Sequence, residues 1–213
     1  MRVILLDNRD SFVYNLVDQL AVLGVGTEVY RNTVPASAVL AALEPTARET
    51  AAGQRPALVL SPGPGHPRQA GCMMGVLGAA LERGLPTLGI CLGFQAIVEA
   101  CGGSVGRVEP VHGRCTRAEV TSAGRADAAF AVLDGGPLDV ARYHSLGTRE
   151  LPADLECLAR TSDGIVMAAR HRRRPAVGLQ FHPESILTPA GPAILRALIA
   201  GLTTTTASAG ENR

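Results

Sequence analysis

The chain of 213 residues has no tryptophan, and aromatic residues make up only 3% of it. Proteins that stack on nucleobases depend on aromatic side chains, so we do not expect binding of that kind. The formal net charge of +1 provides no strong field for nucleic acid or for an acidic membrane. No apolar stretch approaches the roughly 18 residues of a membrane-spanning helix, and the first apolar run is too short for a signal peptide. We therefore expect a cytoplasmic protein without a nucleic-acid or membrane partner.

Lysine is also absent, since all 20 basic residues are arginine. Schiff-base and pyridoxal-phosphate chemistry need a lysine amine, so both are excluded. The phosphate-binding loop that ends in Gly-Lys-Ser/Thr is excluded for the same reason. We therefore do not expect this chain to spend ATP itself.

Cysteine is present in an odd number and without any Cys-x-x-Cys pair, which argues against a disulfide framework and against a zinc site. The five cysteines are Cys72, Cys91, Cys101, Cys115 and Cys157. Their wide spacing is typical of buried thiols in a reducing compartment, and we adopt that interpretation for all of them except Cys91. No histidine–cysteine spacing supports a metal site either, so we expect none.

The first two-thirds of the chain alternates short apolar runs with segments of helical periodicity. The expected strands are residues 3–6, 27–30, 57–60 and 87–90, and the expected helices are 11–23, 37–43, 71–83 and 93–101. Ser11 has the character of a helix N-cap. Strands that alternate with helices in this order predict right-handed crossovers and a parallel sheet.

From Ser104 onward the pattern changes to strands joined by turns, at residues 138–143, 155–159, 165–169 and 176–181. Such spacing is typical of an antiparallel meander. Residues 189–202 predict a last amphipathic helix, and residues 203–213 are polar and repetitive, as in a disordered tail. The fold class is therefore α/β: an open, mostly parallel twisted sheet with helices on both faces, plus a small antiparallel β meander.

Residues 89–93, Gly-Ile-Cys-Leu-Gly, lie where the fourth expected strand meets the next helix. This is the pattern of a nucleophile elbow with cysteine in the place of serine. The helix N-terminus favours the thiolate of Cys91, and the N–H of Leu92 can hold an oxyanion. An inert cysteine packed between glycines is the alternative. The flanking glycines and the strand-to-helix junction favour the nucleophile.

Residues 180–185, Gln-Phe-His-Pro-Glu-Ser, lie at the end of the last expected strand. Side chains two residues apart in an extended chain point to the same side, so His182 and Glu184 project together. A base that activates a thiol needs a carboxylate to fix its tautomer. With Cys91, the pair composes a Cys-His-Glu triad. A chain-end turn with a solvated glutamate is the alternative.

The loop Pro62-Gly63-Pro64-Gly65 follows the third expected strand. Its alternating prolines and glycines present backbone N–H groups at fixed positions, which suits an oxyanion or a polar substrate. His144 could line the same site, although we assign it no proton transfer.

Taken together, five ordered motifs resemble those of class I (triad-type) glutamine amidotransferases, and among them the glutaminase subunits, component II, of anthranilate synthases. The motifs are residues 6–12, 60–65, 89–97, 142–146 and 181–187. The resemblance covers nearly the whole chain, from residue 5 to about 202. It implies a flavodoxin-like fold and a single glutamine amidotransferase type 1 domain over residues 1–202.

The resemblance also implies a reaction with L-glutamine. Cys91 attacks the side-chain amide to form a glutamyl thioester, His182 transfers the protons, and Glu184 orients His182. The N–H groups of Gly63 and Leu92 form the oxyanion hole. The residues that hold glutamine are Gly63, Pro64, Gly65, Gln95, Ser145 and Leu146.

The implied partner is a chorismate-binding synthase subunit, anthranilate synthase component I. Ammonia passes to it through a channel and gives anthranilate, pyruvate and glutamate, a step of tryptophan biosynthesis. The resemblance places Mg²⁺ and chorismate on that partner and no cofactor on this chain.

Two positions depart from the family pattern. Phe94 stands where the family usually has histidine, so we expect that catalysis needs no imidazole there. The usual His-Gly-Lys is His112-Gly113-Arg114, which keeps the charge but not its shape. We associate that segment with coupling between the two subunits.

Other functions remain open at this point. Within the family, the alternatives are the glutaminase of aminodeoxychorismate synthase in folate biosynthesis, a glutaminase shared by both pathways, and an equivalent protein of secondary metabolism. Residues 71–73, 96–100 and 164–168 resemble the anthranilate type more closely. Outside the family, the alternatives are a cysteine hydrolase or peptidase of related fold and a non-catalytic binding module.

Overall fold

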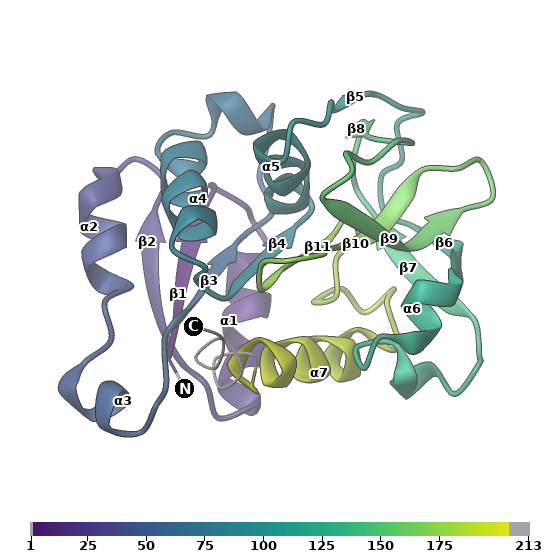
Figure 1. The fold of residues 1–213 in the computed structure, drawn as a ribbon. Coiled ribbons are helices and arrows are strands. Elements are labelled where there is room, and N and C mark those ends of the chain that lie inside the picture. The colour runs from purple at the N-terminus through teal and green to yellow at the C-terminus, as the bar shows by residue number, and fades with distance from the viewer. Residues whose placement is uncertain (1, 205–213) are drawn as a thin grey trace.

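Nine strands form one continuous, twisted sheet in the computed structural model, which describes residues 2–204 (Figure 1). One half of the sheet is parallel, in the order β2 (Gly26–Arg31), β1 (Arg2–Asp7), β3 (Ala57–Leu60), β4 (Thr87–Ile90) and β11 (Ala176–Leu179). The other half is antiparallel, in the order β10 (Val166–His171), β9 (Leu155–Thr161), β6 (Arg114–Val120) and β7 (Leu138–Arg142).

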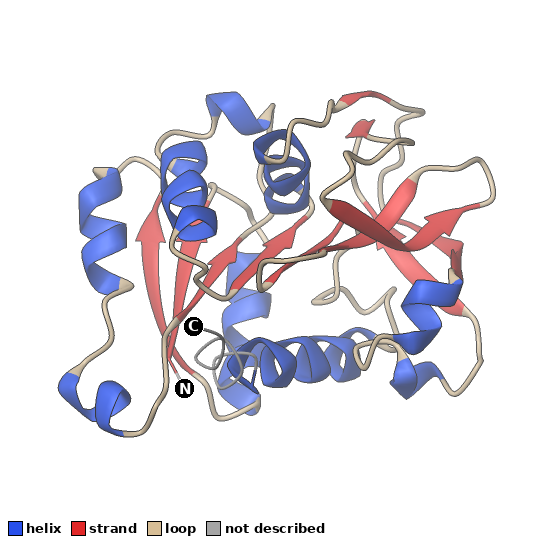
Figure 2. Ribbon diagram, viewed as in Figure 1, coloured by secondary structure: helices blue, strands red, loops and turns tan. Residues whose placement is uncertain are grey.

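Helices cover both faces of the sheet (Figure 2). Helices α1 (Val13–Val22) and α7 (Gly191–Thr204) pack on one face, while α2 (Ala36–Ala42), α4 (Met73–Glu82) and α5 (Leu92–Ala100) pack on the other. Every residue of β3, β4 and β11 is buried, as expected for strands covered on both sides. The shorter helices are α3 (Ala47–Ala51), α6 (Ser122–Ala126), η1 (Pro67–Gln69) and η2 (Ala131–Leu133).

The expected fold class is confirmed, and the structure adds one detail to it. The antiparallel strands continue the main sheet through the β10–β11 pairing and do not form a separate unit. A second, two-stranded antiparallel sheet joins β5 (Gly106–Arg107) to β8 (Leu146–Gly147). Strand β6 was not expected, because its sequence has no regular apolar alternation and most of its residues are at least partly exposed.

Two expectations about helix ends differ from the structure. Ser11 is not the N-cap of α1: that position belongs to Phe12, whose N–H donates to Asp10 Oδ2 at 2.9 Å. Among the described residues, no side chain forms a capping hydrogen bond with the first turn of α1. The last helix continues to Thr204, so residues 203 and 204 of the expected tail are helical. The rest of that tail, residues 205–213, lies outside the described residues. Within residues 2–204, no helix has the length and apolar character needed to cross a membrane.

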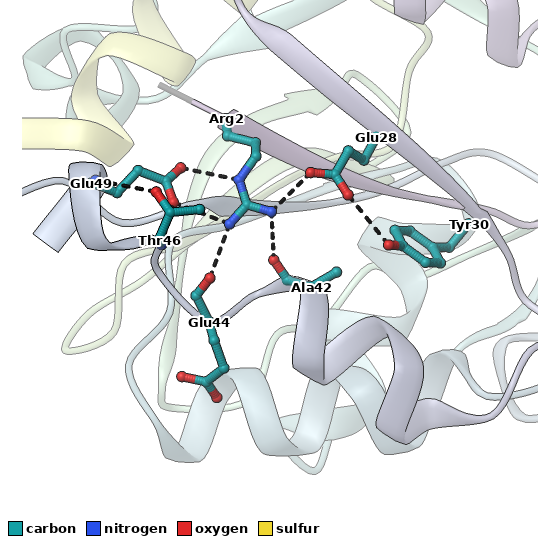
Figure 3. Close-up of polar contacts among 7 residues, drawn as sticks. All are labelled: Arg2, Glu28, Tyr30, Ala42, Glu44, Thr46 and Glu49. Carbon is teal, nitrogen blue, oxygen red and sulfur yellow. Dashed lines mark hydrogen bonds and ion pairs between the residues drawn. The ribbon is translucent and has the colours of Figure 1, made fainter.

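Arg2 ties the first strand to the arm of chain that carries α2 and α3 (Figure 3). Its guanidinium pairs with Glu49 at 3.1 Å and with Glu28 at 2.9 Å. It also donates to two carbonyl oxygens, those of Ala42 and Glu44. The hydrogen bond from Arg2 is the largest cause that lowers the pKa of Glu49 to about 2. These contacts fix the α2–α3 arm at the end of the sheet opposite the carboxyl ends of the strands.

Candidate active site

The residues of the candidate site gather at the carboxyl ends of the parallel strands. Asn8 follows β1, Gly63 lies in the loop after β3, Cys91 directly follows β4, and His182 follows β11. These four strands are neighbours in the sheet, so their ends meet at one edge. Ligands of open α/β sheets bind at that edge.

Cys91 occupies a sharp turn between β4 and α5, of which it is the N-cap. Its backbone has φ 50° and ψ −98°, a conformation that non-glycine residues rarely adopt and that is typical of functional turns. The Cys91 N–H donates to Leu179 O at 2.7 Å, which fastens the turn to β11. A Cβ atom on Gly89 would lie 2.4 Å from Gly93 O, so the turn requires a glycine two residues before Cys91. The elbow expected from the sequence is therefore present.

His182 and Glu184 point toward each other, with Nδ1 and Oε1 2.6 Å apart and both side chains almost fully buried. Burial by itself lowers the pKa of His182, but the neighbouring Cys91 and Glu184 outweigh it and raise the pKa well above the ordinary value. The other ring nitrogen of His182, Nε2, is buried and has no hydrogen-bond partner among the described residues. That nitrogen is therefore available to exchange a proton.

The backbone of His182 is held by β7 and by Thr188. The His182 N–H donates to Ala141 O at 3.2 Å, and Thr188 Oγ1 donates to His182 O at 2.7 Å. The same hydroxyl accepts from Ala141 N at 2.9 Å. The ring of Tyr143 meets the imidazole edge-on, with 5.0 Å between the ring centroids. The sequence analysis missed Thr188, because nothing in the local pattern indicates that residue 188 returns to contact β7.

The loop after β3 is locked beside the elbow. A Cβ atom on Gly63 would lie 2.5 Å from Asn8 O and 3.0 Å from the side chain of Leu92, so the loop packs tightly against the start of α5. Leu92 is the first residue of α5, where backbone N–H groups have no acceptor within the helix. Asn8 fixes the loop by donating through Nδ2 to Ser61 O at 2.9 Å and through its own N–H to Ser61 Oγ at 2.8 Å.

Cys91 lies between two cavities. The first has a volume of about 180 Å³ and contains all six residues expected to hold glutamine. Its lining consists of Cys91, Gly63, Pro64, Gly65, Gln95, Tyr143, His144, Ser145 and Leu146. The second has a volume of about 300 Å³ and is the one that His182 lines. Its lining also includes Cys91, Phe12, His112 and Tyr143. The nucleophile thus lines both cavities, which also share Gly63, Pro64 and Tyr143 in their walls.

His144 is buried in the wall of the first cavity, beside a buried arginine. Arg142 Nε donates to His144 Nε2 at 3.2 Å, and His144 Nδ1 lies 2.8 Å from Leu146 O. Burial, followed by the charge of Arg142, lowers the pKa of His144 to about 4. His144 is therefore neutral at pH 7, and Nδ1 carries the proton because Leu146 O can only accept.

The two departures from the family pattern lie in different surroundings. Phe94 is fully buried and packs against Gly178, and it lines neither cavity beside Cys91. Its side chain belongs to the core. Arg114 is exposed at the start of β6, two residues after His112, which lines the second cavity. In the part of the chain that the structure describes, no group of three or more histidine, cysteine or acidic side chains is placed to hold a metal ion.

Known proteins of one family are similar to this chain over nearly its whole length. A family model described as glutamine amidotransferase class-I matches residues 4–201. The protein named anthranilate synthase component 2 of Corynebacterium glutamicum is 45% identical over 208 residues, which cover 91% of this chain and 94% of that protein.

Two further similarities concern a specialised relative and a solved structure. The pyocyanine-specific anthranilate synthase component 2 of Pseudomonas aeruginosa is 47% identical over 197 residues, which cover 92% of this chain and 91% of that protein. The crystal structure of a Thermoplasma acidophilum protein, described as part of a GMP synthase, superimposes with a TM-score of 0.75 at 26% identity, covering 95% of this chain and 94% of that one.

Proposed function

Because this chain belongs to the glutamine amidotransferase class-I family, we propose that it is the glutaminase subunit of an anthranilate synthase. It hydrolyses L-glutamine and passes ammonia to a chorismate-binding synthase subunit. The observation that carries the proposal is the position of Cys91, on a strained elbow between a cavity lined by the 63–65 loop and a cavity lined by His182. The names of both relatives support anthranilate as the final product.

In the first half of the reaction, the Cys91 thiolate attacks the side-chain carbonyl carbon of glutamine. The negative charge that develops on the carbonyl oxygen is held by the N–H groups of Gly63 and Leu92, two residues whose segments pack against each other. The C–N bond then breaks, and protonated His182 gives its Nε2 proton to the leaving nitrogen, so that ammonia departs and a glutamyl thioester remains.

In the second half, His182 removes a proton from water, which attacks the thioester and releases glutamate. The sulfur leaves as a thiolate and the imidazolium is restored. Glu184 holds the Nδ1 proton throughout, at the observed 2.6 Å, and stabilises the positive charge on the ring. This role needs an ionised carboxylate and no proton transfer to Glu184.

The two cavities separate the substrate from the departing ammonia in this proposal. Glutamine occupies the first cavity, against Gln95, Ser145 and Leu146. Ammonia leaves through the second, past Tyr143 and His112, toward the synthase subunit. The exposed segment that ends at Arg114 is then placed to contact that subunit. The proposal assigns Mg²⁺ and chorismate to the partner, no cofactor to this chain, and a cytoplasmic location to both.

The experiment that tests this function uses the complex with the chorismate-binding subunit of the same organism. Chorismate and glutamine are supplied, and the aminated product is identified by mass. We expect glutamine-dependent anthranilate. Cys91→Ser lowers that activity at least about a thousandfold, since the nucleophile is lost. Synthesis from added ammonium salt survives, because the partner's chemistry does not involve Cys91.

Cys115→Ser is the matched control, because Cys115, which the sequence analysis expected to be buried, is exposed on β6 and lines neither cavity. It retains both activities. Full glutaminase turnover by Cys91→Ser would contradict the mechanism. Formation of aminodeoxychorismate without anthranilate would keep the triad but assign the chain to folate biosynthesis.

A further inference from the structure

Gln180 is a fully buried polar side chain in contact with the reactive sulfur. Its Nε2 donates to Cys91 Sγ at 3.7 Å, and the residue is 0% exposed. The mechanism above gives Gln180 no task. A glutamine in such a position is costly to bury unless its amide groups are paired, so its partners indicate what it does.

The orientation of the Gln180 amide is fixed by its neighbours. Gln95 Nε2 donates to the backbone carbonyl of Leu146 at 2.9 Å, and a carbonyl can only accept. The end of Gln95 that carries Nε2 is thereby identified, and this nitrogen also donates to Gln180 Oε1 at 3.2 Å. With Oε1 committed to Gln95, the NH₂ group of Gln180 is the end that points at Cys91.

The carbonyl oxygen of Leu146 also accepts a hydrogen bond from its other side, from His144. Arg142 has no acceptor atom, so its Nε must donate to His144 Nε2 at 3.2 Å. His144 then carries its proton on Nδ1 and donates to Leu146 O at 2.8 Å. Five hydrogen bonds thus connect Arg142 to Cys91 in series, and the donor of each is defined. None can reverse without leaving two donors or two acceptors facing each other.

We propose that Gln180 is a positioning residue, which holds the Cys91 sulfur as a thiolate by a directed N–H···S hydrogen bond while His182 gives up and takes protons. The proposal rests on the proposed function of Cys91 as the nucleophile. A hydrogen bond to an ion is stronger than one to a neutral group, so an amide N–H stabilises the thiolate more than the thiol. Gln180 thus supplies a stationary donor that does not itself lose a proton.

The test is the pH profile of Cys91 alkylation by iodoacetamide, resolved by mass spectrometry in the substrate-free protein. Gln180→Met keeps the length of the side chain and removes the donor. We expect the rising limb of the profile to move toward higher pH, with each thiolate about threefold more nucleophilic. Alkylation of Cys91 therefore slows on the rising limb, and at the alkaline plateau it becomes about threefold faster.

Two internal comparisons separate this effect from general damage. Exposed Cys115, in the same sample, keeps its profile. The matched control Gln19→Met removes a partly buried glutamine amide of α1 that lines neither cavity, and it leaves the Cys91 profile unchanged. In turnover, Gln180→Met lowers kcat for glutamine, and any accompanying change in KM reports on Gln95, which lines the first cavity and loses its acceptor Gln180 Oε1.

An unchanged Cys91 profile in folded Gln180→Met would overturn the proposal, as would a rise in KM alone. If Gln180→Met does not fold, Gln180→Asn gives the same comparison, because its amide is one methylene too short to reach the sulfur. The alkylation measurement needs no glutamine and no partner. A wild-type protein without glutaminase activity would therefore contradict the proposed function and leave the contact between Gln180 and Cys91 to be judged separately.

Discussion

His144 and His182 line different cavities beside Cys91, and their pKa values move in opposite directions. Burial lowers the pKa of both imidazoles, so the charge of the nearest partner decides the difference. Arg142 beside His144 adds to the effect of burial. Glu184 and Cys91 beside His182 oppose it and prevail. One histidine is thus kept neutral as part of the cavity wall, while the other readily becomes charged.

The low pKa of His144 predicts a pH dependence of stability. Between the ordinary pKa of 6.5 and the folded value of about 4, the unfolded chain binds a proton that the folded protein does not. Stability therefore falls as the pH falls through this window. From pH 7 to pH 5 we expect His144 to account for a loss of about 2 kcal/mol in the free energy of unfolding.

The measurement compares urea unfolding of the wild type and of His144→Gln at pH 7 and pH 5. Gln does not titrate, so the variant is less stable than the wild type at pH 7 but loses less on acidification. Because all other titrating groups are shared, the difference between the two losses isolates His144. Equal losses in both proteins would show that His144 is not held neutral in the fold.

At the scale of elements, the position of Cys91 depends on how closely α5 approaches the sheet. Phe94 is the third residue of α5 and packs directly on Gly178 of β11. A Cβ atom on Gly178 would lie 2.6 Å from Phe94 Cδ2 and 3.2 Å from Phe94 Cα. The aromatic ring at residue 94 therefore requires a glycine on the facing strand, and the pair together sets the depth of the helix that begins at the nucleophile.

Gly178→Ala is expected to lower the free energy of unfolding by about 1–3 kcal/mol through overpacking, and to lower kcat because α5 shifts. Adding Phe94→Leu restores part of both, since the smaller side chain relieves the clash. Urea unfolding and glutamine turnover of the two single variants and the double variant measure this coupling.

Gly75→Ala is the matched control, because a Cβ at this position of α4 meets nothing within 4 Å. It should stabilise the protein by up to about 1 kcal/mol through helix propensity. Strictly additive effects of Gly178→Ala and Phe94→Leu would contradict the proposed contact.

At the scale of the whole molecule, the two halves of the sheet share their hydrophobic cores. One core includes Leu16 of α1 and Leu158 of β9, and the other includes Ile4 of β1 and Leu155 of β9. Neither half closes a core without the other. The active-site residues also come from both halves, since Cys91 follows a parallel strand and Ser145 follows β7.

We therefore expect the parallel and antiparallel halves to unfold together. Thr188→Val removes the hydroxyl that joins His182 O to Ala141 N, at an expected loss of about 1–3 kcal/mol. Native-state hydrogen exchange should show the most protected amides of β1 and β9 losing the same free energy. A loss confined to β6, β7, β9 and β10 would indicate two independently stable units.

The features that the sequence alone determined are local ones. The apolar runs of the central strands are readable because strands buried on both faces must be apolar throughout. The elbow around Cys91 depends on the glycine at position 89. His182 and Glu184 meet as the sequence predicted, but through a turn at residues 183–184 after β11 and not through extended chain. Each of these is fixed within a few neighbouring residues.

The tertiary structure decided what distant segments do to one another. Gln180 reaches Cys91 across 89 positions of sequence, and Ala141 meets Thr188 across 47. Strand β6 is ordered by its partners β7 and β9 and not by its own composition. Contacts of this kind depend on how the elements pack, and packing depends on the whole chain at once.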